Sequence, residues 1–203
     1  MRVISGTARG RPLRAAGQTR PTADLIKGAI FSMLEALAYK RGFEPDEDGN
    51  LAAALAWPRV LDLFAGSGGL GIEALSRGAA SAEFVEQDRE AARLIVSNLR
   101  ATGLEHRARV HQVPVAAALR AVRFPVDVVF ADPPYDATGA LAEAVAALAE
   151  PGRLLPTSVV VLEQAWDTEP PAAVGSLPLA TTRRHGRTRI SLYGAQPPAA
   201  SSR

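Results

Sequence analysis

The chain has 203 residues, of which 47% are hydrophobic and 22% are charged, a balance typical of a globular protein with one buried core. It contains no cysteine, which excludes disulfides, thiolate metal sites and a cysteine nucleophile. The formal net charge is only +2, so the total charge does not by itself indicate a nucleic-acid partner.

The first twenty residues contain no acidic side chain and five basic ones, which are Arg2, Arg9, Arg11, Arg14 and Arg20. No apolar segment follows that could be the core of a signal peptide, and no apolar run is long enough to span a bilayer. We therefore expect a cytoplasmic protein in which residues 1–21 form a basic arm. A second basic cluster lies between Arg183 and Arg189, and the two clusters could frame one groove for an anionic partner.

Helical spacing of apolar residues begins after the arm. From Thr22, a plausible N-cap, the apolar positions predict an amphipathic helix that ends near Gly42. Residues 43–58 have the composition of a polar loop with a short alanine-rich piece, which we interpret as an insertion within a domain of residues 22–195. The tail at 196–203 is rich in Pro, Ala and Ser, so we expect it to be disordered.

After Pro58, short β-rich runs alternate with helical segments, at 60–64, 82–86, 108–113, 126–131 and 158–163. This alternation predicts an α/β fold with a parallel sheet covered by helices on both faces. Asp88 and Gly103 are suitable caps for one intervening helix. Residues 181–194 predict a hairpin that turns at 185–187 and adds antiparallel strands to the edge of the sheet.

The segment VLDLFAGSGGLG, residues 60–71, leads from a buried strand through a glycine-rich turn into a helix. Gly66, Gly68 and Gly71 satisfy G-x-G-x-x-G, a spacing that permits a tight turn and close approach of the backbone to a ligand. Taken alone, the motif fits a nicotinamide dinucleotide site or a purely structural turn as well.

Two acidic residues favour S-adenosylmethionine over a dinucleotide. Asp62 precedes the first glycine by four residues, where a carboxylate suits the ammonium group of that cofactor and does not suit a pyrophosphate. Glu86 ends the second strand and can accept both ribose hydroxyls, as acids at this position also do in nicotinamide enzymes. A loop-fixing role for Asp62 and a simple surface position for Glu86 are the alternatives.

Asp132-Pro133-Pro134-Tyr135 follows the fourth strand, at the edge where open α/β sheets bind ligands. An exocyclic amine conjugated to a base ring is a poor nucleophile, and the Asp132 carboxylate can accept a hydrogen bond from it. Pro133 fixes the backbone so that a carbonyl can act as second acceptor. Tyr135 offers an aromatic face for a base, a contact that contributes about 1 to 3 kcal/mol. Asp-Pro-Pro is also an ordinary way to end a strand.

The chain resembles the RsmD family of 16S rRNA guanine N2-methyltransferases, on the blocks RVISGTARGRPL, RPTADLIKGAIFSML, VLDLFAGSGGLGIEALSRGAA, VEQD and ADPPY. The resemblance implies a Rossmann-like, class I S-adenosylmethionine-dependent methyltransferase fold with a mostly parallel, seven-stranded sheet. It implies a catalytic loop at 132–135 and cofactor contacts from Asp62, Phe64, Ala65, Gly66, Ser67, Gly68, Glu86, Gln87 and Val115. RNA contacts are expected from Arg9, Arg11, Arg14, Arg20 and Thr22.

The sequence departs from the family pattern at Leu25, Gly28, Pro114 and Arg187. We expect a monomer that needs no metal and no membrane and that acts on 16S rRNA or the small ribosomal subunit. Three other functions remain open on the residues alone. They are methylation of DNA adenine or another RNA, nicotinamide-dependent oxidoreduction, and RNA binding without catalysis.

Overall fold

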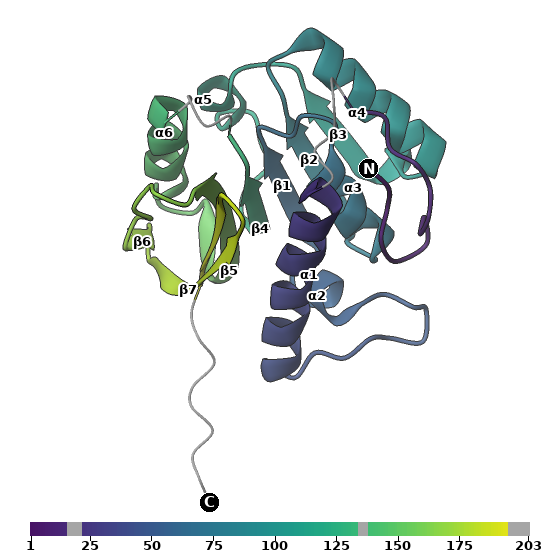
Figure 1. Ribbon diagram of the computed structural model, residues 1–203, viewed down its shortest axis with the longest axis horizontal. Coiled ribbons are helices and arrows are strands. Elements are labelled where there is room, and N and C mark those ends of the chain that lie inside the picture. The colour runs from purple at the N-terminus through teal and green to yellow at the C-terminus, as the bar shows by residue number, and fades with distance from the viewer. Residues whose placement is uncertain (16–21, 134–137, 195–203) are drawn as a thin grey trace, which may run out of the picture.

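The computed structural model describes residues 1–15, 22–133 and 138–194, and it places a single twisted sheet at the centre of the molecule (Figure 1). The strand order is β3-β2-β1-β4-β5-β8-β7-β6. The first five strands in this order pair in parallel, and β8 and β7 continue the sheet in antiparallel pairs. The α/β prediction with a mostly parallel sheet is therefore confirmed.

The strands are β1 (Arg59–Leu63), β2 (Ser81–Val85), β3 (Ala108–His111), β4 (Val126–Ala131), β5 (Leu154–Ala165), β6 (Ala173–Val174), β7 (Leu177–His185) and β8 (Thr188–Tyr193). The bounds of β1 to β4 lie within two residues of the prediction, whereas β5 and β7 each begin four residues earlier than predicted. The predicted hairpin is the β7–β8 pair, with Gly186 in a left-handed conformation at the turn. The sheet has eight strands where seven were expected, because the two-residue β6 pairs with the start of β7. Such a short pairing has no alternating pattern that a sequence could display.

Helices cover both faces of this sheet, at α1 (Thr22–Lys40), α2 (Ala52–Ala56), α3 (Gly69–Ser76), α4 (Arg89–Thr102), α5 (Val115–Ala118) and α6 (Thr138–Leu148), with a 3-10 turn at Glu105–Arg107. One apolar cluster joins α1, α3 and α4 to one face, and a second joins α5 and α6 to the other. On the α1 face the rings of Phe31 and Phe130 lie 5.7 Å apart. The predicted caps of α4 are confirmed, since Asp88 accepts from the Ala91 amide and Gly103 has φ 75°.

Residues 1–15 of the basic arm pack against α3 and α4, with hydrogen bonds to Glu73, Ser76 and Asn98 (Figure 1). The Glu73 carboxylate of α3 accepts the backbone amides of Ile4 and Ser5 at 2.8 and 3.0 Å. It also lies 3.2 Å from the Lys27 ammonium of α1 and 2.9 Å from Nε of Arg77. Glu73 is fully buried, and a buried charge requires such partners. One carboxylate therefore joins the arm, α1 and α3.

No helix in the part of the chain that the structure describes combines the length and apolarity that a membrane span requires.

Candidate active site

The two loops predicted to carry function leave the sheet side by side. β1 pairs with β2 on one side and with β4 on the other, so the chain changes direction across the sheet at β1. Open α/β sheets bind ligands outside the carboxyl ends of their strands at such a switch point. The glycine loop follows β1 there, and Asp132 follows β4.

The glycine loop has a strained backbone with open space beside it. Phe64 has φ 57°, the one positive φ of a non-glycine residue in the described chain, and Gly66 and Gly68 have φ 55° and 80°. Side chains other than glycine rarely tolerate these values. A Cβ on Gly66 would meet nothing within 4 Å. At Gly66 the loop therefore leaves room for a ligand to approach the backbone.

Gly71 is required for a different reason, which is packing. A Cβ at this position would lie 2.4 Å from the Phe84 ring of β2. The absence of a side chain brings α3 directly against the sheet, and it also lets the Gly71 amide donate to Oδ2 of Asp62 at 2.8 Å. The carboxylate of Asp62 thus fixes the start of α3, which matches the loop-fixing alternative and leaves its second oxygen for another partner.

Burial controls the charge of Asp62. The side chain is 2% exposed, and desolvation raises the pKa of its carboxyl to about 8, against a lowering by the Gly71 amide. The negative charges of Asp132 and Glu86 raise the same pKa further. A cation bound beside Asp62 would favour the ionised form and draw this pKa down. The site is therefore suited to a positively charged ligand.

Glu86 at the end of β2 is held from two sides. Its Oε2 accepts the Gly66 amide at 2.8 Å, and its Oε1 accepts the Asp88 amide at 2.8 Å. Each carboxylate oxygen keeps one further acceptor position. A fixed carboxylate beside the glycine loop is geometrically suited to receive a pair of neighbouring hydroxyls.

Asp132 lies immediately after β4, exposed, while Pro133 is buried. It is close enough to Asp62 for the two charges to interact, so the aspartates of the predicted catalytic loop and the predicted cofactor loop lie in one region. Pro134 and Tyr135 lie outside the described residues. Among the residues that the structure describes, no group of three His, Cys, Asp or Glu is arranged to hold a metal ion.

The remaining predicted cofactor residues follow the carboxyl ends of β1, β2 and β3. Ala65 is buried, and its amide donates to the Val85 carbonyl at 3.0 Å, which ties the loop to the end of β2. Gln87 is exposed directly after Glu86. Val115 begins α5 and packs partly against the apolar cluster on the α6 face. Their contact with a cofactor remains a prediction.

The predicted RNA-binding arginines differ in how they are held. Arg9 is exposed, whereas Arg11 Nη1 donates to the Ala101 carbonyl at 3.1 Å. The exposed Arg14 is fixed through its backbone, because its amide donates to Oδ1 of Asn98 and its carbonyl accepts from Nδ2 at 2.9 and 2.8 Å. Arg20 lies outside the described residues, and Thr22 begins α1. The structure therefore places three of these residues on one arm.

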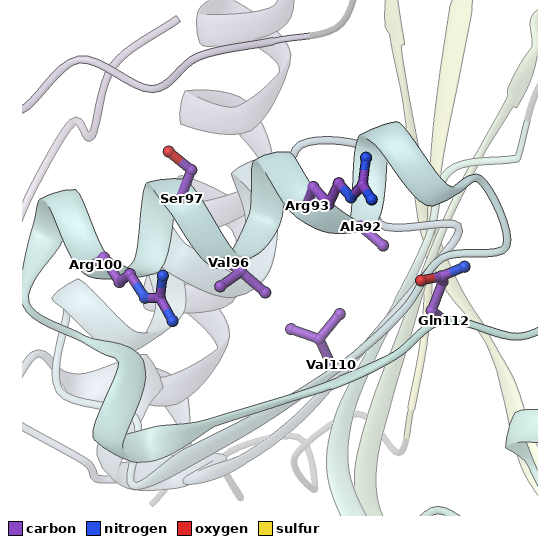
Figure 2. A pocket seen from close by; sticks show the side chains of 7 residues that line it. All are labelled: Ala92, Arg93, Val96, Ser97, Arg100, Val110 and Gln112. Carbon is purple, nitrogen blue, oxygen red and sulfur yellow. The ribbon is translucent and has the colours of Figure 1, made fainter.

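The helix α4 has arginines on a second side. A groove of about 510 Å³ lies between α4 and β3, lined by Ala92, Arg93, Val96, Ser97, Arg100, Val110 and Gln112 (Figure 2). Arg100 pairs with Glu105 at 3.2 Å. At 100° per residue, Asn98 lies on a different side of α4 from Arg93 and Arg100. The helix thus supports the arm on one side and a basic groove on the other.

Two residues that sequence reasoning missed are central to this arrangement. Asn98 is 1% exposed, and besides Arg14 it donates to the Ser67 carbonyl of the glycine loop at 2.9 Å. Glu163 is a buried carboxyl on β5 next to the site. A polar residue at a position that faces the core in α4 was the available signal for Asn98, and an acid at the end of an apolar strand was the signal for Glu163.

The fold and the site together define a class I methyltransferase, and comparisons with known proteins support this. The solved structure of yhhF from Escherichia coli matches with a TM-score of 0.75 at 32% identity, covering 97% of this chain and 99% of that chain. A ribosomal protein L11 methylase from Lactobacillus delbrueckii, 19% identical with a TM-score of 0.60, shares the fold.

A family model described as conserved hypothetical protein 95 matches residues 1–194. YlbH of Bacillus subtilis is 36% identical, covering 95% of this chain and 98% of its own. Ribosomal RNA small subunit methyltransferase D of Escherichia coli is 31% identical, covering 95% and 89% respectively. The chain therefore belongs to this family, the RsmD family that the sequence blocks indicated.

Proposed function

We propose that this protein transfers the methyl group of S-adenosylmethionine to the exocyclic N2 of a guanine in 16S rRNA. The observation that carries the proposal is the register of β1 and β4, in which Leu63 pairs with Ala131, so that Asp132 leaves the sheet beside the candidate cofactor loop. Family membership supports the reaction class, and the relative from Escherichia coli is named for the RNA of the small ribosomal subunit. An rRNA substrate would place the protein in the cytoplasm.

The residues fit the cofactor at three points. Gly66 leaves space beside its backbone, Asp62 offers a buried carboxyl to the ammonium group, and the fixed Glu86 carboxylate offers acceptors to the ribose hydroxyls. When bound, S-adenosylmethionine supplies an activated methyl group on a sulfonium. In this proposal the loop of Phe64 to Gly68, with Gln87 and Val115, shapes the remainder of the cofactor site.

The contribution of the chain to the reaction is position and electrostatics. The Asp132 carboxylate accepts a hydrogen bond from the target amine and holds its nitrogen toward the methyl donor. Pro133 is buried and limits the freedom of the turn. Pro134 and Tyr135 complete the proposed loop. Arg9, Arg11, Arg14, Arg20 and Thr22 bind RNA, and neither a metal nor a second subunit is required.

The test is methyl transfer from isotopically labelled S-adenosylmethionine to small subunits and to 16S rRNA from a strain that lacks the gene. We expect N2-methylguanosine as the labelled nucleoside in mass spectrometry, and much slower transfer by Asp132→Ala. Robust formation of methyladenine in duplex DNA would reverse the choice of substrate. Tight binding of NADH without binding of S-adenosylhomocysteine would overturn the reaction class.

A further inference from the structure

The end of β5 carries a buried carboxyl that the proposed reaction does not use. Ala131 of β4 pairs with Leu162 of β5 in parallel register, so Asp132 and Glu163 are the next residues along their strands. Glu163 is 7% exposed. It is near enough to both Asp132 and Asp62 for their charges to act on it. Three carboxyl groups therefore meet at the carboxyl ends of β1, β4 and β5.

The face of the sheet on which Glu163 lies is also defined. Val159 and Val161 of β5 pack with Phe130 of β4 in the apolar cluster that α1 covers. Because alternate residues of a strand point to the same side, Glu163 continues this row and Gln164 does not. No hydrogen bond to the Glu163 carboxyl is found among the described residues, and burial and the charges of Asp132 and Asp62 raise its pKa.

Glu163 is largely buried at a ligand-binding edge, where a ligand can supply a hydrogen-bond partner to its carboxyl. We propose that Glu163 is a substrate-positioning residue, which hydrogen-bonds the ring edge of the base whose amine Asp132 receives. This inference rests on the proposed methyl transfer. It extends the base site from β4 to β5, on the side of the sheet that α1 covers.

The surroundings of Glu163 determine the form in which it acts. Burial, with the negative charges of Asp132 and Asp62, raises its pKa well above the usual value. On β8, Glu163 pairs with the apolar Ile190. Ile190 in turn pairs with Arg183 of β7, which is exposed. The raised pKa favours the protonated side chain, which has one O–H donor and one carbonyl acceptor. A purine ring edge beside an amine presents such a pair of groups.

Two substitutions separate this role from a structural one. Glu163→Gln keeps a donor and an acceptor without charge, so we expect kcat/KM for RNA within about 3-fold of wild type. Glu163→Leu keeps the approximate volume and removes both groups, and we expect kcat/KM to fall by about 100-fold, on the scale of losing one well-placed polar contact in an active site. Thermal stability should not fall in Glu163→Leu, because an apolar side chain replaces an unpaired buried acid.

Gln164→Leu is the matched control, since it removes the adjacent buried polar side chain on the opposite face of β5 and should leave kcat/KM unchanged. The affinity for S-adenosylhomocysteine should stay within 2-fold of wild type in all three variants. As pH rises through the pKa of Glu163, wild-type turnover should decline, and this decline should be weaker in Glu163→Gln.

Wild-type kcat/KM in Glu163→Leu would overturn the inference, and so would equal losses in the Gln and Leu variants. The variants are compared on whichever substrate the wild type methylates, small subunits first and duplex DNA second. Failure of the rRNA assignment therefore shows in the wild type, and failure of the Glu163 assignment shows in the ratio between variants. Direct RNA binding gives a second readout, in which only Glu163→Leu should lose affinity.

Discussion

The side-chain amide of Asn98 donates a hydrogen bond to the carbonyl of Ser67 at 2.9 Å. The same side chain hydrogen-bonds to both the backbone amide and the backbone carbonyl of Arg14. A single buried residue of α4 therefore connects the glycine loop to the basic arm. The proposed cofactor and RNA sites consequently share one structural support.

Asn98→Ala should destabilise the protein and loosen both attachments. It leaves the Ser67 carbonyl and both Arg14 backbone groups without their partner, and we expect a loss of about 3 kcal/mol in the free energy of unfolding. Denaturant titration measures it. Thr102→Val is the control, because the Thr102 hydroxyl bonds only to carbonyls of its own helix. Similar affinities for RNA and S-adenosylhomocysteine in both variants would show that Asn98 supports neither site.

Alanine at Gly71 should impair folding, whereas alanine at Gly66 should impair cofactor binding. Gly71→Ala places a methyl group 2.4 Å from the Phe84 ring, so the variant should fold poorly or show a strongly lowered Tm. Gly66→Ala meets no atom of the protein and costs about 1 kcal/mol in backbone strain. It should fold and lose affinity for S-adenosylhomocysteine, as calorimetry would show. Unchanged affinity would place the cofactor elsewhere.

Asp62 should make stability and cofactor affinity depend on pH in opposite directions. Its pKa in the folded protein is about 8 and its ordinary value is near 4, so the folded protein holds a proton that the unfolded chain releases between these values. The stability contributed by Asp62 therefore falls as pH rises from about 4 to 8. Asp62→Asn keeps an acceptor for the Gly71 amide, and the Tm advantage of Asn over Asp should grow across this range.

Binding of S-adenosylhomocysteine, whose ammonium group favours the ionised carboxyl, should tighten in the wild type as pH rises from 6 to 8. The change of this affinity with pH should be smaller in Asp62→Asn. Titration of the ligand itself affects both proteins equally, so it cancels when the two are compared. Equal slopes would mean that the ammonium group does not lie beside Asp62.

Asp132→Ala should slow turnover strongly while the cofactor site stays intact. Loss of one well-placed electrostatic group in an active site costs about 100-fold to 1000-fold in rate, and single-turnover methylation measures it. Asp127→Asn is the control at the other end of β4, where the carboxylate pairs with Arg59 at 2.7 Å. It should lower stability without changing the rate. An Asp132→Ala variant with normal turnover would remove this residue from the mechanism.

Neutralising the arm should weaken RNA binding and reduce its salt dependence. For each phosphate that Arg9, Arg11 or Arg14 no longer neutralises, the slope of log K against log salt should fall in magnitude by about one. Arg11→Gln should also destabilise the arm slightly, because its guanidinium bonds to the Ala101 carbonyl. Arg9→Gln should not, since that side chain is exposed. An unchanged slope in the triple variant would show that the arm does not touch RNA.

The features with strong local patterns were predictable from the sequence. Five strands, the caps of α4 and the β7–β8 hairpin depend on periodicity and on turn residues close in the chain. The contact of Asp62 with Gly71 was anticipated only as an alternative, because a motif does not state whether an acid faces a ligand or a backbone amide. The importance of Asn98 and Glu163 was not predicted, because their partners are far away in the chain. Those of Asn98 lie 84 and 31 residues away, and those of Glu163 lie about 30 and about 100 residues away. Such distances carry no local signal.

The Glu73 carboxylate makes the N-terminal segment unfold together with the core. The amides of Ile4 and Ser5 both donate to it, and releasing them would leave a fully buried charge without two of its partners. In hydrogen exchange these two amides should therefore open only when the whole domain opens. A segment that composition alone would describe as a charged tail thus belongs to the cooperative unit that presents the arginines in a fixed place.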